Sequence, residues 1–167
     1  MTDTPATIFI VDDDPSARRG LSRLITAAGM PVESFGSARD FLDQADIGGD
    51  GCIILDVKMP ELTGIELQAE LIKAKNAMSI IFVSGHSDIP IAAGAMKKGA
   101  VDFLTKPVDQ DQLFAAIEEA LKKTRANRRL LSDQAILRKR VDLLTPREYT
   151  VLEHVIAGMP NKIIADS

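Results

Sequence analysis

Acidic side chains and one lysine come at the ends of short apolar runs in this sequence of 167 residues. They are Asp12 and Asp13 after residues 8–11, Asp56 after 52–55, and Lys106 after 101–105. An unpaired carboxylate is very costly to bury, so these acids should lie at the rim of a sheet and share one crevice. Acids in one crevice raise one another's pKa unless a cation lies among them, and oxygen ligands suit a hard ion such as Mg²⁺. The pattern predicts a phosphoryl-accepting aspartate beside a magnesium site.

Aspartate is a suitable nucleophile toward a phosphoryl group because that transfer depends mostly on alignment and charge neutralisation. We expect Asp56 to take the phosphoryl group and Lys106 to balance its charge as a point cation. Ser84 follows the apolar run 80–83 and can donate its hydroxyl group to the phosphoryl oxygens. The expected Mg²⁺ ligands are Asp13, Asp56, Asp12 through a water molecule, and the backbone carbonyl of Lys58.

Short apolar runs alternate with segments of helical periodicity up to about residue 120, which is typical of an α/β fold. The predicted strands are residues 7–11, 31–35, 52–55, 80–83 and 101–105. Five such units favour a (βα)5 doubly wound parallel sheet of order 2-1-3-4-5, whose ligand crevice lies at the carboxyl ends of strands 1 and 3. Those two ends carry Asp12, Asp13 and Asp56. Topology and acid positions therefore predict the same site.

A helix is predicted from Asp109, and neither Gly nor Pro interrupts the sequence before Pro146. Apolar and polar residues spaced by three and four form a heptad pattern that runs through Asn127, Leu130, Gln134, Leu137, Val141 and Leu144. One interpretation is a helical linker that pairs as a parallel coil, with Asn127 fixing the register. The other is a helix that ends near Leu121, followed by a basic linker. The pattern leaves both open.

The composition bounds the class of protein. The net charge is −4 and the chain has a single cysteine, Cys52, which lies inside an apolar run and is expected to pack as a small hydrophobic residue. We find neither a signal-peptide pattern nor an apolar stretch of the ~20 residues that a membrane helix needs. The cytoplasm is the expected compartment. Basic residues gather around 122–140, which suggests a nucleic-acid partner near the C-terminal side.

Several motifs together resemble the receiver domain of two-component response regulators. They are Val-Asp-Asp-Asp at 11–14, Leu-Asp-Val-Lys-Met-Pro at 55–60 with Gly64, Val-Ser-Gly-His at 83–86 and Gly-Ala-Val-Asp-Phe-Leu-Thr-Lys-Pro at 99–107. The resemblance implies Asp56 as phosphoacceptor, Asp12 and Asp13 as metal-site acids, and Ser84 and Lys106 as phosphoryl sensors. It also implies a cis bond before Pro107 and a switch role for Phe103, which swings inward as Ser84 moves.

The C-terminal residues are similar to the first half of the helix-turn-helix of LuxR/FixJ/NarL-type regulators. The similarity rests on Leu-Thr-Pro-Arg-Glu at 144–148, Val151-Leu152, Gly158 and Asn-Lys-Ile-Ile-Ala at 161–165, and residues 85–90 and 95–100 resemble the FixJ branch. Reading a major groove depends on the second helix of that motif. We therefore expect DNA binding in a longer chain and no specific operator binding by these 167 residues. The predicted domains are a receiver at 1–122, a helical linker at 123–143 and a partial helix-turn-helix at 144–167.

The resemblance implies a phosphorylation-dependent regulator that receives its phosphoryl group from a sensor histidine kinase, dimerises and controls transcription. Such a protein is a regulator and not an enzyme, with at most slow self-dephosphorylation. One alternative is a stand-alone receiver that only binds partners. Another is a phosphohydrolase of the haloacid-dehalogenase type, which places its nucleophile in an Asp-x-Asp-x-Thr motif after the first strand. Residues 12–16, Asp-Asp-Asp-Pro-Ser, do not match that motif.

Overall fold

The computed structural model describes residues 5–85 and 89–158 and divides into two compact units, Met1–Arg128 and Arg129–Ser167. The strands are β1 (Thr7–Val11), β2 (Val32–Phe35), β3 (Gly51–Asp56), β4 (Ser79–Ser84) and β5 (Asp102–Thr105). The helices are α1 (Pro15–Ala27), α2 (Ala38–Gln44), α3 (Gly64–Lys73), α4 (Ile89–Lys97), α5 (Gln110–Asp142) and α6 (Pro146–Gly158).

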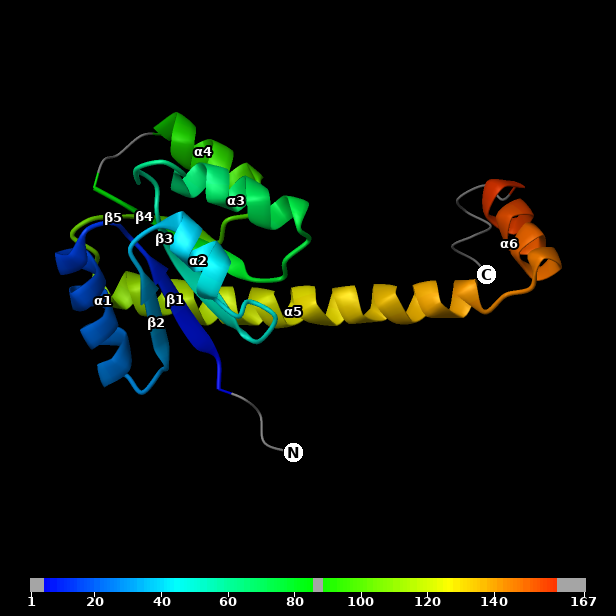
Figure 1. The fold of residues 1–167 in the computed structure, drawn as a ribbon, viewed down its shortest axis with the longest axis horizontal. Coiled ribbons are helices and arrows are strands. Elements are labelled where there is room, and N and C mark those ends of the chain that lie inside the picture. The colour runs from blue at the N-terminus through cyan, green and yellow to red at the C-terminus, as the bar shows by residue number, and fades with distance from the viewer. Residues whose placement is uncertain (1–4, 86–88, 159–167) are drawn as a thin grey trace. The chain divides into compact units, whose positions relative to one another are not determined.

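The strands form one parallel sheet of order β2-β1-β3-β4-β5, which confirms the predicted fold class (Figure 1). Strand β1 lies between β2 and β3, because the winding of the sheet reverses there: β2 pairs with one of its edges and β3 with the other. Val11 is level with Leu55, so the residues that follow β1 lie beside the last residue of β3. This register places the predicted acids at one edge of the sheet.

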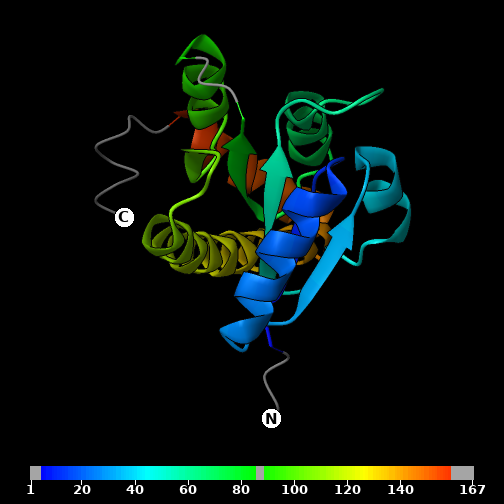
Figure 2. The ribbon, with the colours of Figure 1, turned by 90° about the vertical axis from the view of Figure 1, so that its left-hand side faces the viewer.

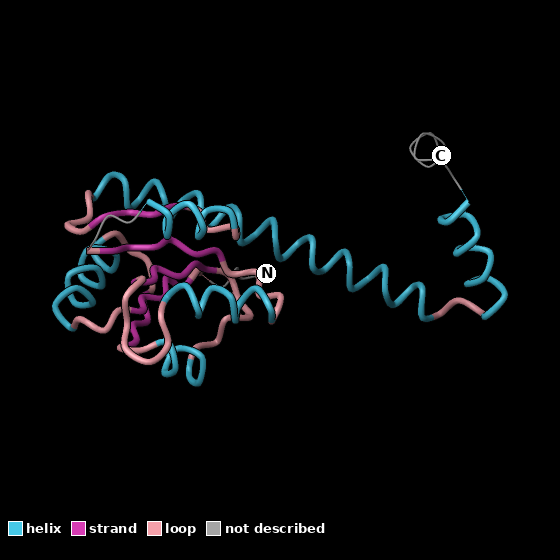
Figure 3. The backbone as a smooth tube through the Cα atoms, turned by 90° about the horizontal axis from the view of Figure 1, so that it is seen from above, coloured by secondary structure: helices cyan, strands magenta, loops and turns pink. Residues whose placement is uncertain are grey.

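Two apolar layers cover the two faces of the sheet, because every strand residue of β3 and β4 is buried and each face alternates along a strand. On one face Phe9, Ile53 and Phe82 pack with α2, α3 and α4. On the other face Ile10 and Ile54 pack with α1 and the first part of α5. Figures 2 and 3 show the sheet between its helices from two further directions. The sheet is therefore a rigid platform for the loops at its carboxyl edge.

Side-chain caps open α1, α2 and α3. The Asp14 side chain accepts a hydrogen bond from the Ser16 amide before the first-turn Pro15, and Ser37 caps α2 in the same way. A reciprocal capping box of Thr63 and Glu66 opens α3, which the sequence reading did not name. These caps fix where the chain leaves the carboxyl edge of the sheet.

Helix α5 continues to Asp142. The linker is therefore helical, and the interpretation in which the helix ends near Leu121 is wrong. Two residues of α5 hold this part of the helix against the start of β4. Ser79 donates its amide to the Thr124 hydroxyl at 2.9 Å, and Asn127 donates its side-chain amide to the Ala77 carbonyl at 3.2 Å. Asn127 thus has a partner inside its own chain instead of the coil register proposed for it. The compact unit accordingly ends after Arg128, later than the predicted domain boundary at 122.

The second unit contains α6, which begins with a capping box. Thr145 and Glu148 exchange bonds between side chain and backbone at 3.1 and 3.2 Å, and these bonds lower the pKa of Glu148. Residues 161–165, which carry part of the similarity to the helix-turn-helix, lie outside the described residues, so the partial helix-turn-helix stays a prediction. In the part of the chain that the structure describes, no helix is long and apolar enough to cross a bilayer.

Candidate functional site: an acid crevice with one lysine

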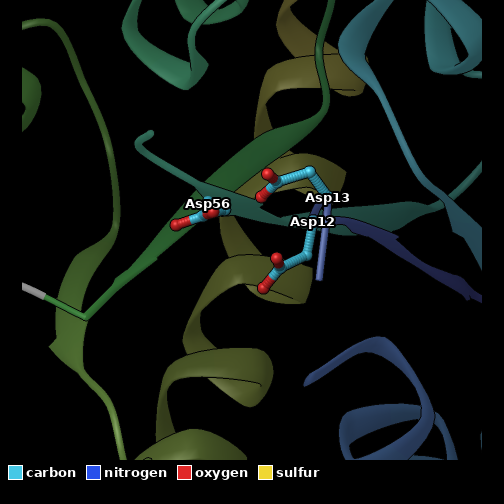
Figure 4. Close-up of side chains that lie close together, drawn as sticks. All are labelled: Asp12, Asp13 and Asp56. Atoms are coloured by element: carbon cyan, nitrogen blue, oxygen red, sulfur yellow. The ribbon is translucent and has the colours of Figure 1, made fainter. Parts of the chain in front are cut away.

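The three predicted acids meet at the carboxyl edge of the sheet (Figure 4). Asp12 and Asp13 follow β1, and Asp56 is the last residue of β3. One carboxylate oxygen from each residue lies within 4.8 Å of the others. Asp12 is only 2% exposed and Asp56 8% exposed, whereas Asp13 is exposed. The predicted shared crevice is therefore present in the fold, with one acid at its mouth and two in its floor.

Lys106 reaches the crevice from the loop after β5. Its Nζ donates a hydrogen bond to Asp12 Oδ2 at 2.7 Å and lies 3.8 Å from Asp56 Oδ1. Its backbone amide donates to the Ser84 carbonyl at 2.8 Å, which fixes the loop against the end of β4. The bond between Lys106 and Pro107 is cis, as the resemblance implied. A single cation thus contacts two of the acids, and its position is set by the neighbouring strand.

The electrostatics of the crevice are unbalanced in favour of negative charge. Burial and the nearby charge of Asp12 raise the pKa of Asp56 from an ordinary 3.8 to about 6, although Lys106 opposes the shift and Asp13 adds to it. Burial on its own would lower the pKa of Lys106, but the hydrogen bond to Asp12 and the charges of Asp12 and Asp56 raise it overall. One lysine therefore does not neutralise the acids that surround it.

A divalent cation fits this donor set. The converging ligand atoms are carboxylate oxygens, which hard ions such as Mg²⁺ prefer, and a cation would remove the repulsion that raises the pKa of Asp56. The fourth predicted ligand, the backbone carbonyl of Lys58, belongs to the loop between β3 and α3, where the Lys58 side chain is exposed. The fold thus places Lys58 two residues after Asp56, and its role as a ligand stays a prediction.

Ser84 and Phe103 lie beside the crevice on the two last strands. Ser84 is the buried final residue of β4 and is level with Thr105, one residue before Lys106. Phe103 is half-buried in β5, and the centroid of its ring lies 6.0 Å from that of Phe82. Both residues are in the predicted positions, and their switch roles stay predictions.

Arg18 belongs to the site, although the sequence reading did not single it out. Its Nη1 donates a hydrogen bond to the Asp12 carbonyl at 2.6 Å, and a Cβ on Gly36 would lie 3.3 Å from the same nitrogen. The guanidinium therefore fills the space over Gly36 and holds the backbone of an acid. Its spacing in the sequence could have indicated this role. Arg18 lies one helical turn after the Asp14 cap, and helical side chains tilt toward the N-terminus of their helix, here toward Asp12.

Gly64 allows the loop that carries Asp56 to close. Its amide donates to the Val57 carbonyl at 2.9 Å, and a Cβ at this position would lie 2.1 Å from the Asp56 carbonyl oxygen. A real Cβ cannot approach a backbone oxygen this closely, so any other residue would displace the loop that carries Asp56.

We expect Gly64→Ala to lower the free energy of unfolding by about 2 kcal/mol, the usual range for overpacking. Gly20→Ala is the matched control, because a Cβ at Gly20 inside α1 would meet no heavy atom within 4 Å apart from the adjacent backbone of its own helix. It should raise stability by up to about 1 kcal/mol through helix propensity. Urea denaturation of both variants measures the difference, and equal stability of the two would contradict the steric argument.

A parallel sheet with an acid crevice at its switch point and a lysine on the neighbouring loop is the architecture of a phosphoacceptor domain. Residues 8–118 match the family described as the response regulator receiver domain, and the chain belongs to that family. This match favours the receiver domain over the other class considered from the sequence, a phosphohydrolase of the haloacid-dehalogenase type.

Relatives along nearly the whole chain place it among transcriptional response regulators. It is 41% identical to the response regulator protein TodT of Pseudomonas putida over 97% of this chain and 71% of the relative. It is 40% identical to the transcriptional regulatory protein FixJ of Bradyrhizobium diazoefficiens, over 97% of this chain and 79% of that protein. The solved structure of the response regulator StyR has a TM-score of 0.77 and 40% identity and covers 98% of this chain and 82% of its own. These similarities confirm the FixJ-type resemblance.

Proposed function

We propose that this chain is a phosphorylation-controlled regulator that accepts a phosphoryl group on Asp56 from a histidine kinase. The observation that carries the proposal is the convergence of Asp12, Asp13 and Asp56 around one point, with Lys106 Nζ 3.8 Å from Asp56 Oδ1. The membership of the receiver family supports the same chemistry.

The proposed transfer is a displacement at phosphorus. An Asp56 carboxylate oxygen forms the new bond to phosphorus, and the bond from phosphorus to the kinase's imidazole nitrogen breaks. The imidazole leaves with that electron pair and takes up a proton, and Asp56 becomes an acyl phosphate. Such a transfer needs alignment and charge neutralisation more than covalent help from the protein.

Each neighbouring residue has a proposed part in that transfer. Mg²⁺, held by Asp12, Asp13, Asp56 and the Lys58 carbonyl, would neutralise charge on the transferred group. Lys106 keeps a positive charge in the crevice, because its pKa is raised by the acids, and it is close enough to turn toward a phosphoryl oxygen. Arg18 holds the Asp12 backbone while these charges change.

We infer that the output passes through Ser84 and Phe103 toward dimerisation and transcription. The Ser84 hydroxyl would bond a phosphoryl oxygen, and the half-buried Phe103 ring would follow it inward. A modification of this kind acts by biasing an element that has two states. The relatives named as transcriptional regulators support DNA as the final target, with α6 as part of the DNA-binding module.

The test is incubation of the chain with acetyl phosphate, a small phosphodonor, followed by intact-mass measurement. We expect one phosphoryl group per chain, formed with Mg²⁺ and not with EDTA, and no continuing release of inorganic phosphate. Continuous turnover would instead indicate a phosphatase. No adduct on folded protein with Mg²⁺ present would contradict the proposal.

A further inference from the structure

A cavity of about 170 Å³ lies at the amino edge of the sheet, at the end of β4 that is opposite to the acid crevice. Four segments of the first compact unit line it: the second half of α3 with the loop after it, the start of β4, the loop between α4 and β5, and the middle of α5. An engineered cavity of roughly 150 Å³ holds a benzene molecule, so this cavity has room for an organic molecule of about six heavy atoms. The proposed phosphoryl chemistry does not use it.

Two buried side-chain oxygens of residues that line this cavity have no hydrogen-bond partner within residues 5–85 and 89–158. They are Oε1 of Gln68 and Oγ of Ser79, residues that are 1% and 4% exposed. The Gln68 side-chain amide donates to the Ala95 carbonyl at 3.0 Å, and a carbonyl only accepts, so the positions of the amide nitrogen and of Oε1 are fixed. Buried polar atoms in native proteins nearly always have a partner. A molecule that enters the cavity is therefore expected to donate to Gln68 Oε1 and to bond the Ser79 hydroxyl.

Two lysines make this cavity attractive to an anion. Lys98 is exposed and lies at the mouth, whereas Lys123 is half-buried and donates from Nζ to the Gly99 carbonyl. An ammonium group has three donors, so Lys123 keeps two for another acceptor. Neither lysine has an ion pair in the part of the chain that the structure describes, and none of the described lining residues is acidic. Uncompensated positive charge at a cleft raises the local concentration of anions.

The rest of the wall offers mainly apolar contacts. It contains the side chains of Leu71, Ile72, Met78, Ile80 and Ala100. Two asparagines also line the cavity, but their side-chain amides already donate inside the chain, from Asn76 to the Ile47 carbonyl and from Asn127 to the Ala77 carbonyl. Inorganic phosphate would leave the apolar wall uncovered, whereas a short organic anion would bury an alkyl group against it.

We propose that this cavity binds the anion of a short α-hydroxy acid, such as lactate. Its carboxylate accepts hydrogen bonds from Lys98, Lys123 and the Ser79 hydroxyl, and its own hydroxyl group donates to Gln68 Oε1. An α-amino acid fits less well, because its ammonium group would lie close to the two lysines. This site does not rest on the proposed function, since none of its residues belongs to the acid crevice.

Titration of the whole chain with lactate in EDTA, followed by heteronuclear NMR, tests the proposal. We expect saturable shifts of the Gln68 side-chain amide and the Ser79 backbone amide. Propionate lacks the hydroxyl group and lactamide lacks the charge, so each should bind about tenfold more weakly than lactate. No saturable shift with lactate or glycolate would show that the cavity holds only water and would overturn the proposal. Equal affinity for all the probes, or shifts confined to Asp12 and Asp56, would overturn it too.

Ser79→Ala separates a role in binding from a role in the fold. The Ser79 backbone amide bonds the Thr124 hydroxyl and is kept, whereas the lost Oγ has no partner among the described residues. The free variant should therefore be at least as stable to urea as the natural chain, but it should bind lactate about tenfold more weakly. A less stable variant with unchanged affinity would assign Ser79 to the fold alone and would overturn the proposal.

Lys98→Met tests the charge at the mouth, and Lys97→Met is its matched control. The two lysines are neighbours in the sequence and both are exposed, but only Lys98 lines the cavity. Lys98→Met should weaken lactate binding about threefold, the usual size for an exposed ion pair, and Lys97→Met should leave it unchanged. Equal effects of the two substitutions would show that lactate responds to net charge only, and would overturn the assigned site.

Discussion

Asp56→Asn abolishes phosphoryl incorporation from acetyl phosphate, with an expected loss of at least about 100-fold in labelling rate. The amide lacks the anionic oxygen that attacks phosphorus, and it removes one ligand from the acid crevice. Its shape hardly differs from that of the carboxyl group, so the 8% exposed site can keep its packing. Intact-mass measurement over time, with Mg²⁺ present, gives the rate for both proteins.

Asp14→Asn is the matched control for this loss. Asp14 lies next to the crevice residues, and its side chain caps α1 by accepting from the Ser16 amide at 3.0 Å. Its charge makes the smallest of the contributions that raise the pKa of Lys106. Asparagine is as good an N-cap as aspartate, so the fold should be unaffected. This variant should label at close to the normal rate. Full labelling of Asp56→Asn would show that another group accepts the phosphoryl group. Equal loss in both variants would show that the loss is not specific to Asp56, and it too would contradict the prediction.

The carboxyl edge of the sheet was predictable because two independent signals converge there. Apolar runs that end in acids locate the strand ends, and the order of a doubly wound sheet puts the ends of β1 and β3 together. The structure confirms that Asp12 and Asp56 meet. It also extends β3 and β4 beyond the predicted limits to include Asp56 and Ser84.

Contacts between distant segments were not predictable from periodicity. Asn127 fits a heptad pattern, yet it binds the carbonyl of Ala77, 50 residues earlier. Gln68 likewise binds the carbonyl of Ala95 at the other end of a helix-strand-helix unit. A sequence pattern shows which face of a helix is apolar, but the partner of a polar side chain depends on how the helices pack.

Asp56→Asn should also make the chain more stable near pH 8 in the absence of divalent metal, because the pKa of Asp56 is about 6 against an ordinary 3.8. Solvent screening of the crevice reduces the expected gain to about 1–2 kcal/mol. Burial and the charge of Asp12 raise the pKa of Asp56 in the folded chain. The folded state therefore binds the proton more tightly than the unfolded state does. The stability from that proton is fully present below about pH 4 and is lost as the pH rises through about 6.

An amide at position 56 imitates the protonated carboxyl group at every pH, so it keeps this stability. Urea denaturation in EDTA should show little difference between the two proteins near pH 4 and a growing advantage of Asp56→Asn up to about pH 7. A difference that is constant with pH would show that repulsion in the crevice is not its cause.

Added Mg²⁺ should reverse the order of stability. A ligand that binds only the folded state stabilises it by an amount that grows with ligand concentration over Kd. The natural chain offers three carboxylates within 4.8 Å, and the variant offers two and an amide. Mg²⁺ should therefore raise the stability of the natural chain more than that of Asp56→Asn, and most strongly above about pH 6, where no proton competes. The clustered negative charges that weaken the metal-free fold are thus the same charges that suit the crevice to Mg²⁺ and to phosphoryl chemistry.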